Sequence, residues 1–457
     1  MPTLTSFDQT RLSLRAGATC LTTPAGAILL DPPINQKLTG LSKAELLTLK
    51  TLNRGPATIA ELSTAAGGEN ISDLLQRLDA AGWLAVTVRD SGHDLYTVHP
   101  FGRPGERSDS SPTSSAVLSK FAVLHRDADG FVLEHPLSWC DVRIHDARLL
   151  TLLDANTETA LPEAVRTRFA DDLFRLGFLV ADADTEGRAF TTRGWSAPDL
   201  WFHRRSTLGD RVVTWEHFGP TKWAKGQFPQ PPARKAPYPG EAIALPVPDL
   251  DELRAQDPSL TAVIEDRIST RAFDDNAPMT VAQLGELLYR TARSKGVRSE
   301  VDGEELVAKP YPSGGSVYEL ELYPVVRNVA GLAPGMYHYD SHDHVLRPVA
   351  AADSTAVAKL VKSTSATLAD GAEPQVLIVM GARSGRIMWT YEQVSYAVIL
   401  KHVGVLMQTV YLVATAMGLG ACAQGFGDTA AFVTAAGVDE LEECSVGSII
   451  VGSPARG

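Results

Sequence analysis

Two arginines and a serine lie within five positions of the chain and could together hold a phosphate group. They are Arg267, Ser269 and Arg271, in the stretch Arg-Ile-Ser-Thr-Arg. A guanidinium offers two parallel N–H donors to phosphate oxygens, and a nearby hydroxyl adds a third donor. Clusters of this kind are more often solvated or salt-bridged surfaces, so the interpretation depends on what the rest of the chain supplies.

Two glycine-containing stretches further along could hold a flat ring. The first is a turn that enters a predicted strand, and it consists of Pro312, Ser313, Gly314 and Gly315. Glycine lets the backbone lie against a ring without a Cβ in the way. The second follows a long helical pattern and offers free backbone N–H groups at Gln424 and Gly425. Together the three stretches could hold a phosphate, a sugar-like chain and a ring.

In order and spacing these stretches resemble the FMN-dependent nitroreductase superfamily, and within it the SagB-type dehydrogenases, the azoline oxidases that form thiazole and oxazole rings. The resemblance covers roughly residues 245–457. It implies FMN as the cofactor, with its phosphate and ribityl chain held by Arg267, Ser269 and Arg271. It further implies that Pro312 to Gly315 line one side of the isoalloxazine, that Gln424-Gly425 present a backbone N–H to flavin N5, and that Arg456 lies near the phosphate.

The same resemblance assigns catalysis to Tyr391, at a place where the chain departs from the family pattern. The family usually has Trp-Lys-Tyr followed by arginines, whereas this chain has Trp389-Thr390-Tyr391 followed by Glu392. A threonine hydroxyl cannot act as a base near neutral pH, and a phenol with the ordinary pKa of about 10 does so only in altered surroundings. Three interpretations therefore stay open: Tyr391 works with another base, the substrate and reaction differ, or flavin binding persists without the usual activity.

The elements after residue 248 predict an α+β domain that positions this site. Residues 376–380 are a continuous apolar run of strand length, which indicates a central strand. Residues 392–417 form a helical pattern that is apolar nearly all round, so we expect it to be buried in the domain or in a dimer interface. We also expect a helix that carries Arg267 and Ser269. The fold class is α+β, with a nitroreductase-like FMN domain over residues 248–457, and the family resemblance implies a homodimer.

The part of the chain before this domain predicts two winged-helix-like modules, at residues 1–102 and 116–194. A helix begins after Ser42, and Glu45 completes a capping box. The second module repeats parts of the first at a similar spacing, which favours duplication of one small domain. Residues 195–247 form a connector rich in tryptophan and then in proline. The modules could simply pack or dimerise; the resemblance favours a clamp for a precursor peptide.

Composition excludes several classes of function. The net charge of −12 argues against nucleic-acid binding, and no apolar run is long enough to predict a membrane span. The first residues lack the features of a signal peptide, and four distant cysteines indicate reduced thiols, so we expect a cytoplasmic location. No metal site is predicted, because His338, His342 and His344 fit alternating polar positions on an exposed hairpin.

The leading hypothesis is an FMN-dependent oxidoreductase that oxidises azoline rings of a ribosomally made precursor peptide to thiazole or oxazole. A cyclodehydratase would be its partner. One alternative is an FMN oxidoreductase with a different peptide or a small-molecule substrate. The other is a flavin-binding scaffold subunit of a peptide-modifying complex.

Overall fold

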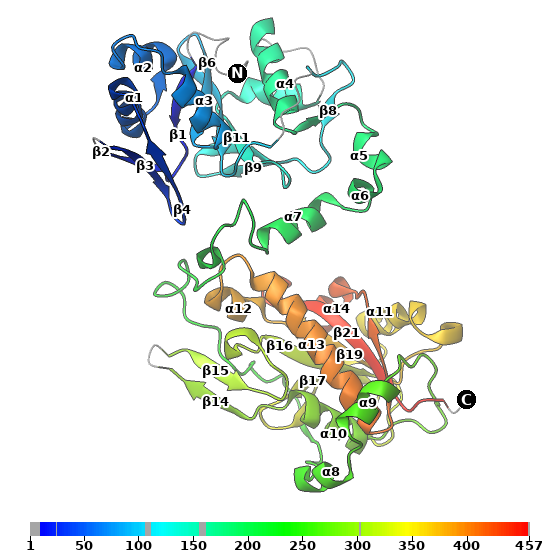
Figure 1. Ribbon diagram of the computed structural model, residues 1–457. Coiled ribbons are helices and arrows are strands. Elements are labelled where there is room, and N and C mark those ends of the chain that lie inside the picture. Colours follow the sequence, from blue (N-terminus) through cyan, green and yellow to red (C-terminus); the bar gives the residue numbers. More distant parts are fainter. Residues whose placement is uncertain (1–9, 24, 106–110, 155–160, 301–302, 456–457) are drawn as a thin grey trace. The chain divides into compact units, whose positions relative to one another are not determined.

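The computed structural model describes residues 10–23, 25–105, 111–154, 161–300 and 303–455. The chain divides into two compact units, Met1–Trp215 and Glu216–Gly457, which are described separately below (Figure 1). Arg456 lies outside the described residues. The segment 195–247, which the sequence presents as a connector, is split between the two units.

Unit 1 is built on an antiparallel seven-stranded sheet that runs through both predicted modules. In spatial order its strands are β5 (Ala57–Thr58), β1 (Arg11–Leu14), β6 (Leu84–Asp90), β7 (His93–Pro100), β11 (Cys140–Ile144), β10 (Gly130–Glu134) and β9 (Val123–Asp127). A separate antiparallel sheet consists of β2 (Thr19–Thr23), β3 (Gly26–Asp31) and β4 (Ile34–Thr39), and a short pair joins β8 (Val117–Leu118) to β12 (Leu179–Val180).

Two helices of unit 1 begin at capping boxes. The capping box at Ser42 and Glu45 opens α1 (Lys43–Arg54), and a second box at Thr58 and Glu61 opens α2 (Ile59–Ala65). The other helical segments are α3 (Ser72–Ala80), η1 (Ala147–Asp154), α4 (Glu163–Arg175), α5 (Thr185–Arg188), α6 (Phe190–Arg193) and α7 (Ala197–Arg205). The assignment of the two modules as winged helices stays a prediction.

A repeated turn supports duplication within unit 1. Gly82 follows α3 with a φ of 75°, and Gly177 follows α4 with a φ of 80°. In both places the next residue, Trp83 or Phe178, donates its N–H back to a leucine carbonyl five residues earlier, at 2.9 and 2.8 Å. Glycine suits a left-handed residue at a helix end, so α3 and α4 end in the same way.

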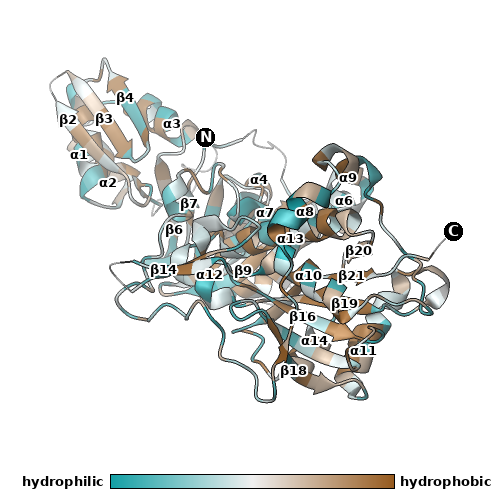
Figure 2. Cartoon of the chain, turned by 90° about the horizontal axis from the view of Figure 1, so that it is seen from below, coloured by the Kyte–Doolittle hydropathy of each residue, from teal (hydrophilic) through white to brown (hydrophobic). Residues whose placement is uncertain are grey.

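Unit 2 is a three-layer structure around a second antiparallel seven-stranded sheet. The strands in spatial order are β13 (Ile243–Ala244), β18 (Val345–Ala351), β17 (Gly335–Asp340), β16 (Leu320–Val326), β19 (Val376–Ala382), β21 (Cys444–Gly452) and β20 (Gly420–Gln424). β19 is buried along its whole length between β16 and β21, so the prediction of a central strand is confirmed. Figure 2 shows the contrast between this apolar strand and the hydrophilic α8 (Leu250–Gln256).

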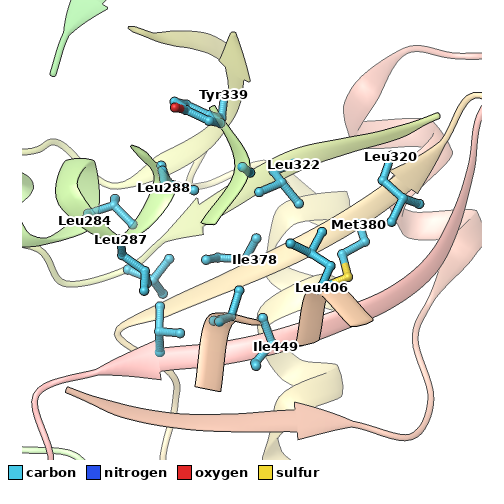
Figure 3. Close-up of a cluster of buried hydrophobic side chains, with 14 of the residues drawn as sticks. Leu284, Leu287, Leu288, Leu320, Leu322, Tyr339, Ile378, Met380, Leu406 and Ile449 are labelled. Carbon is cyan, nitrogen blue, oxygen red and sulfur yellow. The ribbon is translucent and has the colours of Figure 1, made fainter. Parts of the chain in front are cut away.

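Helices cover both faces of this sheet. On one face α10 (Val281–Ala292) and α13 (Ser395–Ala416) pack against β16 and β19, and Leu284, Ile378 and Leu406 meet in this core (Figure 3). On the other face α11 (Thr355–Ser363) and α14 (Thr429–Ala436) enclose a second core. The remaining elements are α9 (Leu260–Asp266), α12 (Ser384–Thr390), η2 (Trp215–His217), η3 (Gly314–Ser316), η4 (Thr364–Ala366), η5 (Ala369–Gly371) and the hairpin β14 (Gly296–Ser299) with β15 (Glu305–Ala308).

α13 is long and apolar enough to cross a membrane by length and composition, which the sequence analysis did not anticipate. A central core helix of a soluble protein passes the same test. Here the side chains of Ile399, Val403, Leu406 and Val410 are buried in the core of unit 2. Its other face is more open, with Tyr396 and Leu400 exposed at 44% and 38%. One face of α13 therefore packs on the sheet, and the other presents exposed apolar residues beside the polar Lys401 and Gln408.

Two expectations about local structure are wrong. α9 ends at Asp266, so Arg267 and Ser269 lie beyond the helix in an extended segment that bridges to β20. His338 and His344 are buried at 3% and 7% exposure, and only His342 is half-buried. Both histidines have polar partners inside the unit, Glu321 for His338 and Tyr339 for His344, which the alternation of polar letters did not reveal.

Candidate functional site

The segment from Arg267 to Arg271 lies against the edge strand β20. Ser269 forms a parallel bridge with Ala421, and the Thr270 N–H donates to the Ala421 carbonyl at 2.9 Å. A Cβ at Gly420 would come within 2.6 Å of the Thr270 side chain. Glycine at position 420 is therefore required for the approach that fixes this segment.

The two arginines of this segment remain available to an anion. In the part of the chain that the structure describes, neither Arg267 nor Arg271 forms an ion pair with a carboxylate. Arg267 is half-buried, with its guanidinium 5.4 Å from the centre of the Tyr411 ring, and Arg271 is exposed. Two cations without carboxylate partners beside a hydroxyl are the donor set that a phosphate monoester needs, so these residues fit the FMN phosphate.

Tyr411 of α13 connects the parts of this phosphate cluster, and the sequence analysis missed it. Its hydroxyl accepts a hydrogen bond from the Ala423 N–H at 2.7 Å and lies 3.1 Å from the Ser269 hydroxyl. The tyrosine thus ties the serine to β20. A tyrosine within an apolar helical pattern predicts only a core residue, because the partners come from distant parts of the chain.

Gln424 and Gly425 lie at the end of β20. The Gln424 side chain is buried, accepts a hydrogen bond from the Ser448 hydroxyl at 2.7 Å and donates to Thr367 at 3.3 Å. Gly425 is exposed, and a Cβ placed there would meet no atom within 4 Å. The geometry leaves room beside the Gly425 backbone for a ligand, while Gln424 is held by its neighbours.

The turn at Pro312 to Gly315 is clamped from two sides. The Gly315 φ is 62°, and a Cβ there would come within 2.9 Å of the Tyr391 hydroxyl. A Cβ at Gly314 would meet Val398 and His402 of α13 at 3.3 and 3.4 Å. The structure thus brings two predicted site residues, Gly315 and Tyr391, into one cluster, which we call the turn cluster.

Within the turn cluster, hydrogen bonds fix the turn itself. The Ser313 hydroxyl accepts from the Tyr318 N–H at 3.1 Å. The Gly314 N–H donates to Nε2 of His402 at 2.7 Å, and Nδ1 of the same ring lies 2.8 Å from the Glu319 carboxylate. Neither Glu319 nor His402 stood out in the sequence, because the partners of each lie in distant parts of the chain.

Tyr391 follows the last turn of α12 and is held by main-chain contacts. Its N–H donates to the Ile387 carbonyl at 2.8 Å, and Tyr391 forms an antiparallel bridge with Pro220. The neighbouring Thr390 hydroxyl donates to the Arg386 carbonyl of its own helix at 3.3 Å. The Thr390 hydroxyl is therefore bonded within α12, whereas the Tyr391 hydroxyl lies against Gly315 of the turn.

Two arginines of this region, also missed from the sequence, organise the backbone around the turn. Arg386 is fully buried and donates to the carbonyls of Val317 and Glu305, each at 3.0 Å, and of Pro231. Burial and the nearby Arg383 lower the pKa of Arg386 to about 10, so it stays a cation at neutral pH. Arg383 donates to the Pro232 carbonyl at 2.8 Å.

The two clusters lie on different sides of α13. His402 of the turn cluster and Tyr411 of the phosphate cluster are nine residues apart on this helix. At 3.6 residues per turn this spacing is about two and a half turns, which places the two side chains on opposite flanks. One protomer therefore presents the predicted phosphate and ring contacts on opposite sides of its central helix.

Comparison with known proteins identifies the domain that carries both clusters. A family model described as the nitroreductase family matches residues 264–453, and a model described as cyanobactin oxidase ThcOx matches residues 116–211. A protein of Methanocaldococcus jannaschii described as a nitroreductase is 29% identical over 186 residues, which cover 41% of this chain and 85% of the relative.

Solved structures with nitroreductase descriptions are also similar. One from Ralstonia eutropha has 23% identity and a TM-score of 0.37, covering 52% of this chain and 99% of its own. One from Anabaena variabilis has 21% identity and a TM-score of 0.40, covering 55% of this chain and 45% of its own. A chain of the Escherichia coli microcin synthetase McbBCD complex with truncated pro-MccB17 has 19% identity and a TM-score of 0.35, covering 42% of this chain and 70% of its own.

The two family matches confirm the resemblance stated from the sequence and the enzyme class that it implies. Residues 264–453 form an α+β nitroreductase-family domain, and together with the match at residues 116–211 this domain indicates an oxidoreductase.

Proposed function

We propose that this protein is an FMN-dependent oxidase that converts azoline rings of a precursor peptide to thiazole or oxazole. The observation that carries the proposal is the combination of two matches in one chain, a nitroreductase domain preceded by a segment similar to a cyanobactin oxidase. A nitroreductase match alone would leave the substrate open. The second match supports a peptide-modifying enzyme.

The chain's own residues divide the work of such an oxidation. Arg267, Ser269 and Arg271 would hold the FMN phosphate, and the Gly314-Gly315 turn would support the ring. FMN bound there would supply the redox chemistry, a two-electron oxidation of the azoline with dioxygen as the final electron acceptor. The azoline also loses one proton, and Tyr391, whose hydroxyl oxygen lies against Gly315, is the group we assign to accept it in its deprotonated, phenolate form.

We propose a homodimer in which each flavin contacts both protomers. The support is the position of the two clusters on opposite flanks of α13, together with the exposed Tyr396 and Leu400 on the outer face of this helix. A second copy packed along that face would bring its turn cluster towards the phosphate cluster of the first. The site is incomplete in a single chain under this arrangement.

Unit 1 is proposed as the part that holds the peptide. β4 is an edge strand of its sheet, and next to it lies a cavity of about 480 Å³ lined in part by Asn35, Gln36, Trp83 and Arg103. An edge strand can accept a peptide as an added strand, and the neighbouring side chains would give specificity. A cyclodehydratase that makes the azolines would be the partner that supplies the substrate.

A second candidate function is supported by Thr390. Because the lysine usual in azoline oxidases is absent here, the domain would also suit an FMN oxidoreductase with a small-molecule substrate. One experiment distinguishes the two. Purified protein is incubated with a cyclised precursor peptide, and the proposal expects a mass loss of about 2 Da per azoline, the two hydrogens removed by oxidation to the aromatic ring. An unchanged peptide mass, with turnover of a nitroaromatic or quinone by NADH, would favour the small-molecule function.

A further inference from the structure

We infer that Glu319 and His402 are positioning residues, which fix the flavin-lining turn by holding the Gly314 amide. This inference rests on the proposed function for the role of the turn, but the contact itself can be tested without any flavin. The two residues come from separate elements: His402 from the middle of α13, and Glu319 from the residue before β16. Neither belongs to the cluster that would bind the phosphate.

The hydrogen-bond partners define the protonation state of His402. A backbone N–H can only donate, so Nε2 of His402 must be the acceptor for Gly314 at 2.7 Å. The ring is therefore neutral and carries its proton on Nδ1, which donates to the Glu319 carboxylate at 2.8 Å. A carboxylate opposite Nδ1 selects this tautomer, and the tautomer selects which nitrogen faces the turn.

The cost of burying Glu319 argues that the carboxylate does more than pack. Glu319 is fully buried, and its second oxygen has no hydrogen-bond partner among the described residues. Buried carboxylates are unfavourable unless they are paired. The charges of Lys309 and Arg386 act on this region and offset part of the cost, while Glu321 and Arg383 also lie in the same polar group. The buried Glu319 carboxylate accepts a hydrogen bond from Nδ1 of His402 and thereby selects the tautomer with the proton on Nδ1.

The turn depends on this contact because its conformation is otherwise unfavourable. Ser316 and Tyr318 have φ values of 55° and 50°, in the left-handed region that side-chain-bearing residues rarely adopt. Such backbone persists only where surrounding contacts hold it. The Gly314 bond to His402 is one of the polar contacts that hold it here, together with the Ser313 bond to Tyr318 and the Arg386 bond to the Val317 carbonyl.

Matched substitutions separate the hydrogen bond from packing. His402→Gln keeps an acceptor that can reach the Gly314 N–H, whereas His402→Leu has similar bulk and no acceptor. Glu319→Gln keeps an oxygen for Nδ1–H, whereas Glu319→Leu removes it and lets the ring take the other tautomer. Hydrogen–deuterium exchange of the apo-protein, full-length and free of flavin, is then followed in peptides that span residues 312–318.

We expect exchange in this turn to be about five-fold or more faster in both leucine variants, and within about three-fold of the wild type in both glutamine variants, as loss of one buried hydrogen bond predicts. Exchange in β19 serves as the control for folding. If His402→Leu fails to fold, the Glu319 pair decides the question alone. Equal exchange in a leucine variant and its glutamine counterpart would overturn the inference.

FMN titration of the same proteins separates this inference from the proposed function. Wild-type protein that binds no FMN would end the proposed function, whereas the exchange pattern would still stand or fall by itself. If FMN binds, the leucine variants should bind it about ten-fold more weakly and with an altered visible absorption spectrum. Removal of a phosphate contact such as Arg271 should weaken binding and leave the spectrum unchanged.

Discussion

Tyr391 and Pro220 lie opposite each other in an antiparallel bridge, so the first segment of unit 2 pairs with the backbone on both sides of the tyrosine of the candidate site. The Thr221 N–H donates to the Thr390 carbonyl at 3.2 Å, and the Glu392 N–H donates to the Gly219 carbonyl at 3.2 Å. Residues 390–392 and residues 219–221 thus form one short antiparallel pair. The position of the Tyr391 hydroxyl against the Gly315 turn depends on this contact as well as on α12.

Replacement of Tyr391 by phenylalanine should abolish most turnover without loss of flavin. The ring and its packing remain, and only the hydroxyl that we assign to the proton is removed. A positioned acid–base group accounts for about 10²–10⁴-fold in rate, so kcat on the azoline peptide should fall by that amount. Tyr289→Phe on α10 is the matched control. Full activity of Tyr391→Phe would leave the tyrosine a packing role only.

Thr390→Lys is the complementary change. It restores the Lys-Tyr pair that the resemblance leads us to expect, and the Thr390 side chain gives up only a hydrogen bond within its own helix. If the reaction is azoline oxidation, turnover of the peptide should rise. A variant that folds and binds FMN but oxidises the peptide more slowly than the wild type would argue against this reading of Thr390.

Arg271→Ala should weaken FMN binding by about 1.5–3 kcal/mol, the range for a hydrogen bond to a charged group. The expectation follows from a guanidinium that forms no ion pair within the described residues and lies beside Ser269. Fluorescence titration of apo-protein with FMN measures the change. Arg298→Ala, an exposed arginine on β14, should leave the affinity unaltered. Equal affinities for Arg271→Ala and the wild type would remove Arg271 from the site.

Leu400→Glu should convert a homodimer into monomers. Leu400 lies on the outer face of α13, and a carboxylate buried there in a dimer interface would lack a partner. Light scattering should give twice the 49.0 kDa of one chain for the wild type and the mass of one chain for the variant. Val297→Glu, an equally exposed site on β14, should stay dimeric. A monomeric wild type would contradict the shared flavin site.

Unit 2 should lose stability in acid through Glu321. Burial alone would raise the pKa of this carboxyl, but the hydrogen bond from His338 and the charges of His338, Lys309 and Arg383 outweigh it and lower the pKa to about 2. Because the folded pKa is below the unfolded value of 4.5, the stabilisation is present above pH 4.5 and is lost as the pH falls towards 2. The difference corresponds to on the order of 3 kcal/mol.

Urea unfolding between pH 6 and pH 3 provides the measurement for this prediction (the pH range is about the window in which the carboxyl of the unfolded chain takes up its proton). Glu321→Gln should be less stable than the wild type at the upper end and should approach it as the pH falls. A constant difference between the two proteins across this range would contradict the assignment of the shift to Glu321.

Signals that act over a few residues were sufficient to place many elements from the sequence. The capping box at Ser42 begins α1 where its spacing indicates, because the bonds involved span three residues. The apolar run of β19 needed no partner to be recognised. The stretch at 267–269 was wrongly expected to be helical because its extended form is imposed by β20, more than 150 positions later.

The residues of the candidate site also divide into those that could be predicted from the sequence and those whose role depends on long-range contacts. Its arginines, glycines and Tyr391 could be proposed because a family resemblance supplied the long-range information. Tyr411, His402, Glu319 and Arg386 could not, because each acquires its role from a partner that is distant in sequence. His338 was misjudged for a related reason: alternation of polar residues predicts an exposed face only when no buried acid such as Glu321 receives them.

The proline-rich segment before β13 acts as an intramolecular ligand for the rest of unit 2. A proline has a carbonyl but no N–H. Here the Pro231 carbonyl accepts a hydrogen bond from Arg386, and the carbonyls of Pro232 and Ala233 accept hydrogen bonds from Arg383. A fragment that begins at residue 248 would leave the buried Arg386 without the Pro231 carbonyl, and Arg383 without the carbonyls of Pro232 and Ala233, and should fold poorly, whereas one that begins at Glu216 should fold. A synthetic peptide of residues 216–247, added in trans, should then rescue the shorter fragment.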